Sequence, residues 1–143
     1  MNVDKQATQT CFVDSNIWLY AFMEGQDADK TALAQNLVRR DYLVVSTQII
    51  NEVCVNPVKK AKLEEARIQN IIEDFNLKYT VVRLDKDILL KASELRERYK
   101  FSYWDSLVVA CALAADASVL YSEDMDTSLV IEGRLRITNP LVH

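Results

Sequence analysis

The sequence has 143 residues, a formal net charge of −4 at pH 7 and a pI near 5.0, which suits one domain that buries roughly two thirds of its unfolded surface. Half of the residues are hydrophobic and 27% are charged, a composition that excludes an intrinsically disordered chain, and no apolar run approaches the roughly 20 residues that span a bilayer. The acidic charge argues against a general nucleic-acid coat protein, although metal ions can neutralise an acidic site locally.

The first half of the chain predicts two strands that alternate with helices. Residues 11–14 (CFVD) predict a short buried strand that passes directly into a helix, SNIWLYAFME. Asp29 is positioned to cap a further helix that extends through Arg40. Residues 42–46 (YLVVS) predict the second strand. The helix that follows, TQIINEVCV, is predicted to stop before Pro57, because proline cannot donate a helical hydrogen bond.

The second half continues the alternation. Residues 64–76 carry apolar side chains at helical spacing, residues 79–84 (YTVVRL) predict a third strand, and Asp85 is placed to cap the next helix. A buried helix, YWDSLVVACALAA, leads through a short turn into a fourth strand at 118–122, and residues 134–138 predict a last strand. The apolar positions at helical spacing before the third strand are Ile68, Ile71, Ile72 and Phe75. In the helix after that strand, the positions expected to face inward are Ile88, Leu89, Ala92, Leu95 and Tyr99.

Short β-branched strands that alternate with helices predict an α/β fold. We expect a single domain over residues 1–143, with three layers (α/β/α) around a central, mainly parallel sheet. Residues 1–10 are polar and lack the apolar segment of a secretory signal, so they are expected to form a flexible segment. Cys11, Cys54 and Cys111 lie in apolar runs without disulfide or zinc spacing, which predicts reduced cysteines and a cytoplasmic location without membrane association.

Two absences narrow the chemistry. The one histidine is His143, so Ser-His or Cys-His catalysis and histidine-ligated zinc would have no histidine inside the fold. The two glycines, Gly25 and Gly133, are isolated, so neither a phosphate-cradling loop nor a dinucleotide fingerprint is present. Carboxylates that act together with a metal ion are the most plausible chemistry left.

Four carboxylates far apart in the sequence are predicted to meet at one edge of the sheet, where the strands of parallel sheets end. Asp14 closes the first strand, and Asp124 follows the fourth strand by two residues. Glu52 lies in the second turn of the helix after strand two. Asp105 begins a helix that should run antiparallel to strand four. Four clustered carboxylates repel one another, and a divalent cation is the usual resolution.

Each acid also has a purely structural explanation. Asp14 could cap the following helix, and Asp105 could interact with a helix dipole. Asp124 and Asp126 lie in a polar loop, where such residues usually form turns. Glu52 lies among apolar residues, where an ionised carboxylate needs either solvent or a cation.

The segments FVDSNIWLYAF, STQIINEVCVNP, FSYWDSLVVACAL and VLYSEDM, followed by VIEGRLRITNP, resemble the successive signature blocks of PIN domains, and in particular of the ribonuclease toxins of bacterial VapBC-type toxin–antitoxin pairs. The resemblance spans residues 11–140. It implies a divalent-metal-dependent endoribonuclease that hydrolyses RNA phosphodiester bonds, with Mg²⁺ or Mn²⁺ bound by Asp14, Glu52, Asp105 and Asp124. It also implies a homodimer and a small antitoxin protein that covers the carboxylate edge.

The same resemblance suggests supporting residues. Asn16, two places after the first acid, matches a polar position that commonly supports the site in this family. The hydroxyls of Ser15, Thr47 and Ser122 could act similarly. The last acid of the family is less regular, so Asp126 could share or replace the role of Asp124.

RNA would need positive charge beside an acidic edge. One basic cluster consists of Lys59, Lys60, Lys62 and Arg67, and the other of Arg96, Arg98 and Lys100. The second cluster is better placed, because it immediately precedes the helix that bears Asp105. A solvated helix face is the alternative explanation for both clusters. Three aromatic residues lie in or just after this second cluster: Tyr99, Tyr103 and Trp104. They are expected in the core, and base stacking is the alternative role.

Other functions remain open from the sequence. The same fold could be a non-catalytic partner-binding module, which would typically lack one or more acids. It could also be an RNA-processing, DNA-directed or structure-specific nuclease outside toxin–antitoxin systems. A phosphatase with an aspartyl nucleophile typically has two aspartates two residues apart after its first strand, and this chain has Asp14 and then Asn16.

Overall fold

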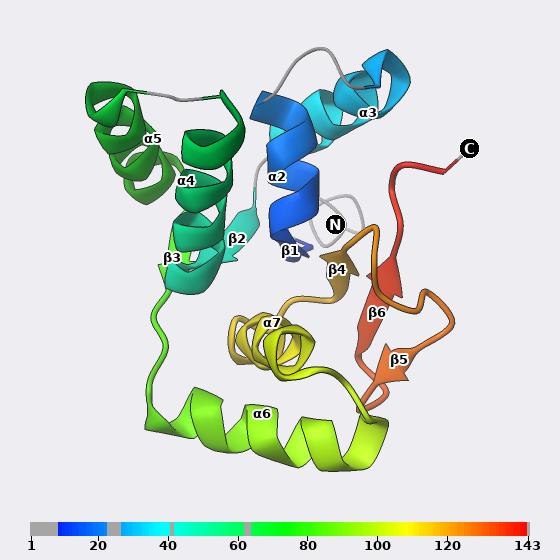
Figure 1. Cartoon of the computed structure of the whole chain (residues 1–143). Helices are drawn as coiled ribbons and strands as arrows, with labels where there is room; N and C mark the ends of the chain where they lie inside the picture. Colours follow the sequence, from blue (N-terminus) through cyan, green and yellow to red (C-terminus); the bar gives the residue numbers. More distant parts are fainter. Residues whose placement is uncertain (1–8, 23–26, 41, 62–63, 143) are drawn as a thin grey trace, which may run out of the picture.

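The computed structural model describes residues 9–22, 27–40, 42–61 and 64–142, with only the backbone described for residues 56–61. The elements in chain order are β1 (Cys11–Val13), α2 (Ser15–Phe22), α3 (Ala28–Val38), β2 (Leu43–Ser46), α4 (Thr47–Ala61), α5 (Glu65–Lys78), β3 (Thr80–Val82), α6 (Lys86–Tyr99), α7 (Tyr103–Ala114), β4 (Val119–Tyr121), β5 (Val130–Ile131) and β6 (Leu135–Thr138) (Figure 1). Most of the predicted flexible segment, residues 1–8, lies outside the described residues.

The strands form one six-stranded sheet in the order β3-β2-β1-β4-β6-β5. All neighbouring strands are parallel except β5, which is antiparallel to β6. The prediction of a mainly parallel sheet is therefore confirmed. In the register, Cys11 faces Leu43 of β2 and Val119 of β4, so β1 is central and its carboxyl end lies between the ends of its two neighbours.

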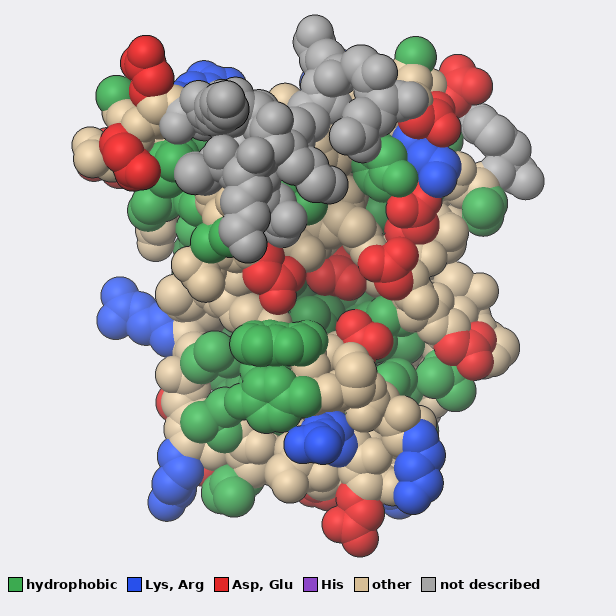
Figure 2. All heavy atoms as spheres, in the orientation of Figure 1, with side chains coloured by type: hydrophobic (Ala, Val, Ile, Leu, Met, Phe, Trp, Pro, Cys, Tyr) green, Lys and Arg blue, Asp and Glu red, His purple; other side chains and the backbone are tan. Residues whose placement is uncertain are grey.

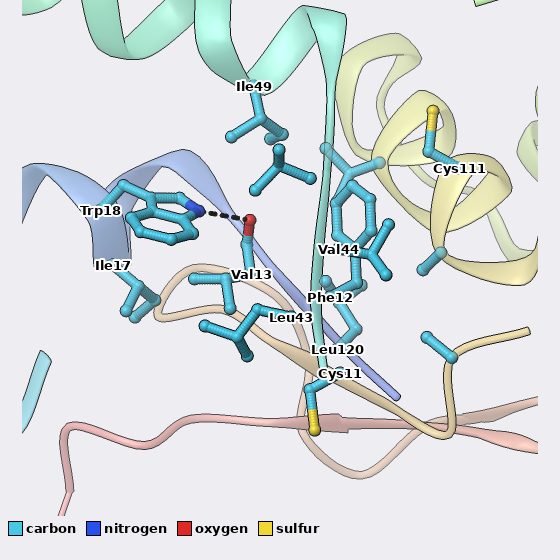
Figure 3. Close-up of a cluster of buried hydrophobic side chains, with 14 of the residues drawn as sticks. Cys11, Phe12, Val13, Ile17, Trp18, Leu43, Val44, Ile49, Cys111 and Leu120 are labelled. Carbon is cyan, nitrogen blue, oxygen red and sulfur yellow. Dashed lines mark hydrogen bonds between the residues drawn. The ribbon is translucent and has the colours of Figure 1, made fainter. Parts of the chain in front are cut away.

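Helices cover both faces of the sheet, as the α/β/α prediction requires. Figure 3 shows Ile17 and Trp18 of α2 on one side of the central strands and Cys111 of α7 on the other. Side chains of β1 alternate between these faces, and both Phe12 and Val13 are fully buried. Because both faces are covered, the strand is apolar throughout instead of alternating between apolar and polar residues.

The core also fixes the start of α2 relative to β1. The Trp18 indole N–H donates a hydrogen bond of 3.2 Å to the Val13 carbonyl (Figure 3). Its ring packs edge-on against Phe75 of α5 and Tyr79, with ring centroids 4.9 and 5.1 Å apart. These contacts hold the β1–α2 junction, which carries Asp14, against the core.

Two predicted helix boundaries were wrong. The cap of α3 is Asp27 and not Asp29: the Asp27 carboxylate accepts hydrogen bonds from the backbone N–H groups of Asp29 and Lys30. The helix α4 does not stop before Pro57 but continues to Ala61. Proline removes only its own backbone donor, at a cost of about 3 kcal/mol, so the other helical hydrogen bonds can continue past it.

Two residues of the predicted apolar patterns are exposed, and one of them, Leu89, was expected to face inward. Leu89 is 45% exposed and Ile72 is 39% exposed. Each directly follows a buried residue of its helix, Ile88 or Ile71, and therefore lies about 100° further around the helix. The two helices bury narrower stripes than the predicted ones, and in α6 the buried stripe consists of Ile88, Ala92 and Leu95.

Within the described residues, none of the helices has the length and apolar character that crossing a membrane requires.

Candidate functional site

Asp14 lies at the carboxyl end of the central strand and is only 7% exposed. Its backbone N–H donates to the Tyr121 carbonyl at 2.9 Å, which ties it to β4. One carboxylate oxygen accepts a hydrogen bond of 2.7 Å from the Ser15 backbone N–H, and the other accepts one of 2.8 Å from the Ser122 hydroxyl. The side chain is thus held between the ends of two adjacent parallel strands.

The charged form of Asp14 is disfavoured. The pKa of its carboxyl is raised from 3.8 to about 6, mainly by burial and also by the charges of Glu52 and Asp105, while the hydrogen bonds from Ser122 and Ser15 oppose the rise. A helix cap normally accepts from the second or third N–H of its helix. Asp14 instead contacts the first N–H and a hydroxyl from another strand, so capping alone does not explain its position.

Asp105 lies in the first turn of α7 and is partly buried. Ser102 caps this helix, its hydroxyl oxygen accepting the Asp105 backbone N–H at 3.1 Å. Burial raises the pKa of the Asp105 carboxyl, as do the charges of Asp124 and Glu52, against the opposing effect of Ser102. A carboxylate that served only the helix dipole would be stabilised in its charged form, whereas Asp105 is destabilised in that form.

Asp124 follows β4 and is linked to α2. Its carboxylate accepts a hydrogen bond of 3.0 Å from the Asn16 side-chain amide, and its backbone N–H donates to the Ser122 hydroxyl at 3.3 Å. The Asn16 amide oxygen accepts the Glu123 backbone N–H at 3.4 Å. Asn16 therefore joins the start of α2 to the loop after β4 and orients Asp124.

Glu52 lies one turn after Gln48 on α4 and is partly buried. Its carboxylate accepts a hydrogen bond of 3.0 Å from the Gln48 side-chain amide. The Gln48 side chain is buried, and its amide oxygen has no hydrogen-bond partner among the described residues. The charge of Glu52 raises the pKa of both Asp14 and Asp105, which places all three in one electrostatic environment.

The remaining predicted supporting residues divide into two groups. The Ser122 hydroxyl and the Ser15 backbone contact Asp14 directly, as described above. The Thr47 hydroxyl donates to the Val82 carbonyl at 3.3 Å and so links α4 to β3 instead. Asp126 accepts hydrogen bonds from the N–H and hydroxyl of Ser128, at 2.8 and 2.7 Å, and these bonds lower its pKa. Its contacts are those of a turn residue.

The better-placed basic cluster lies at the end of α6, and its three side chains are exposed: Arg96, Arg98 and Lys100. The Arg96 guanidinium lies 5.7 Å from the centre of the Tyr103 ring. Of the other predicted cluster, Arg67 is exposed on α5, whereas Lys62 and the side chains of Lys59 and Lys60 lie outside the described residues.

Two of the three aromatic residues expected in the core are exposed. Tyr103 is 46% exposed and Trp104 is 61% exposed, so the prediction for them was wrong, while Tyr99 is partly buried against the core. Both exposed residues belong to the first turn of α7, which extends beyond the buried part of that helix, Ser106 to Leu113.

One contributor to the site, and the different orientation of one neighbouring acid, were not identified from the sequence. Gln48 contacts Glu52, and the spacing of four residues on one predicted helix is the signal that could have found it. Glu123 precedes Asp124 but points elsewhere: its carboxylate accepts from the Lys30 ammonium at 2.6 Å and the Tyr20 hydroxyl at 3.0 Å.

On the surface, acidic side chains form a band across the middle of one face, between α2 and α4 on one side and α6 and α7 on the other (Figure 2). Carboxylate oxygens are the ligands that Mg²⁺ and Mn²⁺ prefer, so the donor type fits such an ion. Within the described residues, however, no three His, Cys, Asp or Glu side chains are gathered closely enough to hold a metal ion. A cation would have to draw the mutually repelling carboxylates together.

The comparisons with known proteins agree with this architecture. The family model for the PIN domain matches residues 11–131. A comparison with curated proteins gave no match. Among solved structures, a toxin–antitoxin complex from Klebsiella pneumoniae superposes with a TM-score of 0.68 at 20% identity, covering 92% of this chain and 98% of that chain.

Two further solved structures are similar. The sarcin–ricin loop cleaving toxin VapC20 of Mycobacterium tuberculosis has a TM-score of 0.68 and 20% identity, covering 83% of this chain and 93% of that chain. VapBC2 from Rickettsia felis, bound to a DNA fragment from its promoter, has a TM-score of 0.64 and 17% identity, covering 92% of this chain and 98% of that chain. At these identities the likeness establishes the fold.

Proposed function

This chain belongs to the PIN domain family, and we propose that it is a divalent-metal-dependent endoribonuclease that hydrolyses RNA phosphodiester bonds. The observation that carries the proposal is the convergence of acids from separate elements at the carboxyl edge of the sheet. Burial is the main cause of the raised pKa of Asp14 and of Asp105, and the charges of Glu52 and Asp105 add to the first shift while those of Asp124 and Glu52 add to the second. A fold gains nothing from such mutual repulsion, so a cationic ligand is its best explanation.

The metal would be Mg²⁺ or Mn²⁺, bound by Asp14, Glu52, Asp105 and Asp124. When bound, such ions lower the pKa of a water molecule and stabilise the departing oxygen of a phosphodiester. The single histidine of the sequence is the terminal His143, which is consistent with chemistry that needs no imidazole base.

The residues around the acids would hold them in position. The Ser122 hydroxyl and the Ser15 backbone N–H orient Asp14. The Asn16 amide orients Asp124, and the Gln48 amide orients Glu52. Each donor leaves part of its carboxylate's hydrogen-bonding capacity available for a cation.

We further propose that the protein is the toxin of a toxin–antitoxin pair, that it forms a homodimer, and that a small antitoxin covers the carboxylate edge. Support comes from the similar structures, which include toxin–antitoxin complexes. A basic side chain of the antitoxin could take the place of the metal at this acidic edge. A cytoplasmic location fits the three free, buried cysteines.

Cleavage of an RNA panel by the purified protein tests the proposal. With Mg²⁺ or Mn²⁺ we expect internal cuts that leave a 5′ phosphate and a 3′ hydroxyl, and EDTA should abolish them. Cleavage that persists in EDTA would contradict the metal-dependent mechanism. An intact fold that binds a protein partner but cuts neither RNA nor DNA would instead identify a non-catalytic binding module.

A further inference from the structure

The first turn of α7 exposes two aromatic rings to solvent. Trp104 is 61% exposed and Tyr103 is 46% exposed. Their ring centroids lie 5.2 Å apart with an interplanar angle of 85°, so the rings form an edge-to-face pair. Figure 2 shows hydrophobic side chains gathered directly beside the acidic band, on the same face of the molecule. The two rings therefore leave apolar surface exposed to solvent.

This aromatic pair directly adjoins the candidate site. Asp105 is the next residue along the chain, and its carboxylate is coupled to those of Glu52 and Asp124. The Ser102 hydroxyl accepts the Asp105 N–H and thereby fixes the turn that carries both rings. A nucleotide that stacks on Trp104 would therefore be held at the same helical turn that carries this candidate metal-binding carboxylate.

Positive charge lies beside one of these rings. The Arg96 guanidinium lies over the Tyr103 ring at 5.7 Å from its centre, and Arg98 and Lys100 follow it at the end of α6. None of these three cations forms a salt bridge within the described residues. Proteins that bind single-stranded nucleic acids combine aromatic rings with cations, because bases stack on rings and phosphates contact cations.

We propose that Trp104 and Tyr103 form a stacking platform for unpaired bases of an RNA substrate, with Arg96 contacting the phosphate beside the stacked base. The inference rests on the proposed function, because it states how the substrate of that same site is positioned. The substrate segment must be single-stranded, since the faces of bases in a duplex are already covered by their neighbours. A loop or an unpaired end of a folded RNA satisfies this requirement.

Tryptophan fluorescence reports on the platform directly. The chain has two tryptophans, and Trp18 is only 1% exposed, so a base that stacks on the protein can quench only Trp104 efficiently. The titration uses the purified protein in EDTA, which prevents cleavage, with a short single-stranded RNA and an abasic strand of the same length. We expect saturable quenching by the RNA and little by the abasic strand. Equal quenching by both strands would overturn the proposal, because phosphate contacts alone would explain it.

Substitutions distinguish RNA binding by base stacking on Trp104 from RNA binding by any exposed hydrophobic side chain. Trp104→Ala should weaken RNA binding, measured by anisotropy of a labelled strand, by about tenfold or more. Trp104→Phe should largely retain affinity. Leu90→Ala is the matched control, since Leu90 is also 61% exposed but lies on α6 and not beside the two rings of α7. This variant should have wild-type RNA affinity. Unchanged RNA affinity in Trp104→Ala, above all if that variant loses a co-purifying protein partner, would assign the surface to protein binding and overturn the proposal.

Kinetics separate this inference from the function on which it rests. In Mn²⁺, Trp104→Ala should raise KM about tenfold or more with kcat largely retained. Cleavage with an unchanged KM would refute the platform and leave the nuclease intact. Base-dependent quenching without any cleavage by the wild type would support the platform as an RNA-binding surface while the proposed nuclease activity failed.

Discussion

Two neighbouring residues after β4 lie in opposite electrostatic environments. Glu123 points toward α2 and α3, where the Lys30 ammonium and the Tyr20 hydroxyl contact its carboxylate. Asp124 points toward the candidate site, where its charge raises the pKa of Asp105. The first acid is neutralised by the fold, whereas the second adds to a group of like charges. The contrast separates an acid that is paired within the fold from an acid that we propose binds a metal ion.

The same contrast holds beyond this loop. Glu132 forms an ion pair with Lys91, and Asp116 forms one with Arg134. Neither Asp14 nor Asp105 forms a salt bridge within the described residues, and the pKa of each is raised. Of these pairs, the one between Asp116 and Arg134 is exposed, and exposed ion pairs typically contribute only about 0–1 kcal/mol. Removing a site acid and removing a paired acid should therefore have different consequences for activity and for stability.

The largest expected effect is on cleavage. Asp105→Asn keeps the size and the hydrogen-bonding capacity of the side chain but removes a charge needed to bind the cation. RNA cleavage in Mn²⁺ should fall by about three orders of magnitude, with an unchanged circular dichroism spectrum. Glu65→Gln and Asp74→Asn are controls, because both residues are exposed on α5. They should retain nearly full activity and stability within about 0.5 kcal/mol.

The next effect is a gain in stability. Because the pKa of Asp14 is raised to about 6 in the folded state, folding favours its protonated form. In EDTA, wild-type stability should therefore fall as the pH rises from about 4 to above 6, by up to about 3 kcal/mol. Asp14→Asn should lack this fall and be more stable by about 2 kcal/mol at pH 8. Urea denaturation at several pH values measures the difference, and an Asn variant that is less stable at pH 8 would identify Asp14 as a structural residue.

A smaller effect is expected at the fully buried Ser122. Its hydroxyl donates to Asp14 and accepts the Asp124 backbone N–H. Ser122→Ala leaves both groups with one partner fewer, so we expect a loss of about 1–2 kcal/mol in the free energy of unfolding together with weaker cleavage. Ser128→Ala is the matched control, since Ser128 contacts only the turn residue Asp126 among the bonds described above. A Ser122→Ala protein with wild-type stability and activity would remove Ser122 from the support of the site.

The smallest effect should come from the paired acid. Glu123→Gln removes one side of the partly buried Lys30 ion pair but retains a hydrogen-bonding group. Cleavage should stay within about twofold of the wild type, and unfolding free energy should change by no more than about 1 kcal/mol. Loss of cleavage comparable to that of Asp105→Asn would show that the division between paired and site acids is wrong.

Much of the fold was predictable because local pattern and global packing agree. The β-branched runs and the helical apolar spacing gave the main strands and helices in the correct order, and the parallel topology then brought the ends of β1, β2 and β4 to one edge. The strand β5 was not predicted because its two residues are too few to show the alternation of apolar and polar side chains that identifies a strand. Asp27 lies two residues before the predicted cap Asp29, and the direction of the backbone, which the sequence does not show, decides which of the two caps α3.

The site was less predictable in its details. Sequence spacing assigns Asp14, Asp105 and Asp124 to the same edge, but it does not show which way a loop side chain points, so the different environments of Glu123 and Asp124 could not be inferred. The exposure of Trp104 was missed because helical periodicity does not reveal that the first turn of α7 extends past the core. The antitoxin, the dimer and the metal remain predictions.

Calorimetric titration with Mn²⁺ tests the central claim most directly, because it depends on neither the identity of the RNA nor the rate of cleavage. The wild type and Glu123→Gln should give saturable heats of binding and higher melting temperatures in millimolar Mn²⁺ than in EDTA. Asp14→Asn should give little heat and little shift in melting temperature. No binding by the wild type, or equal binding by the wild type and Asp14→Asn, would contradict the assignment of this edge as a metal-binding site.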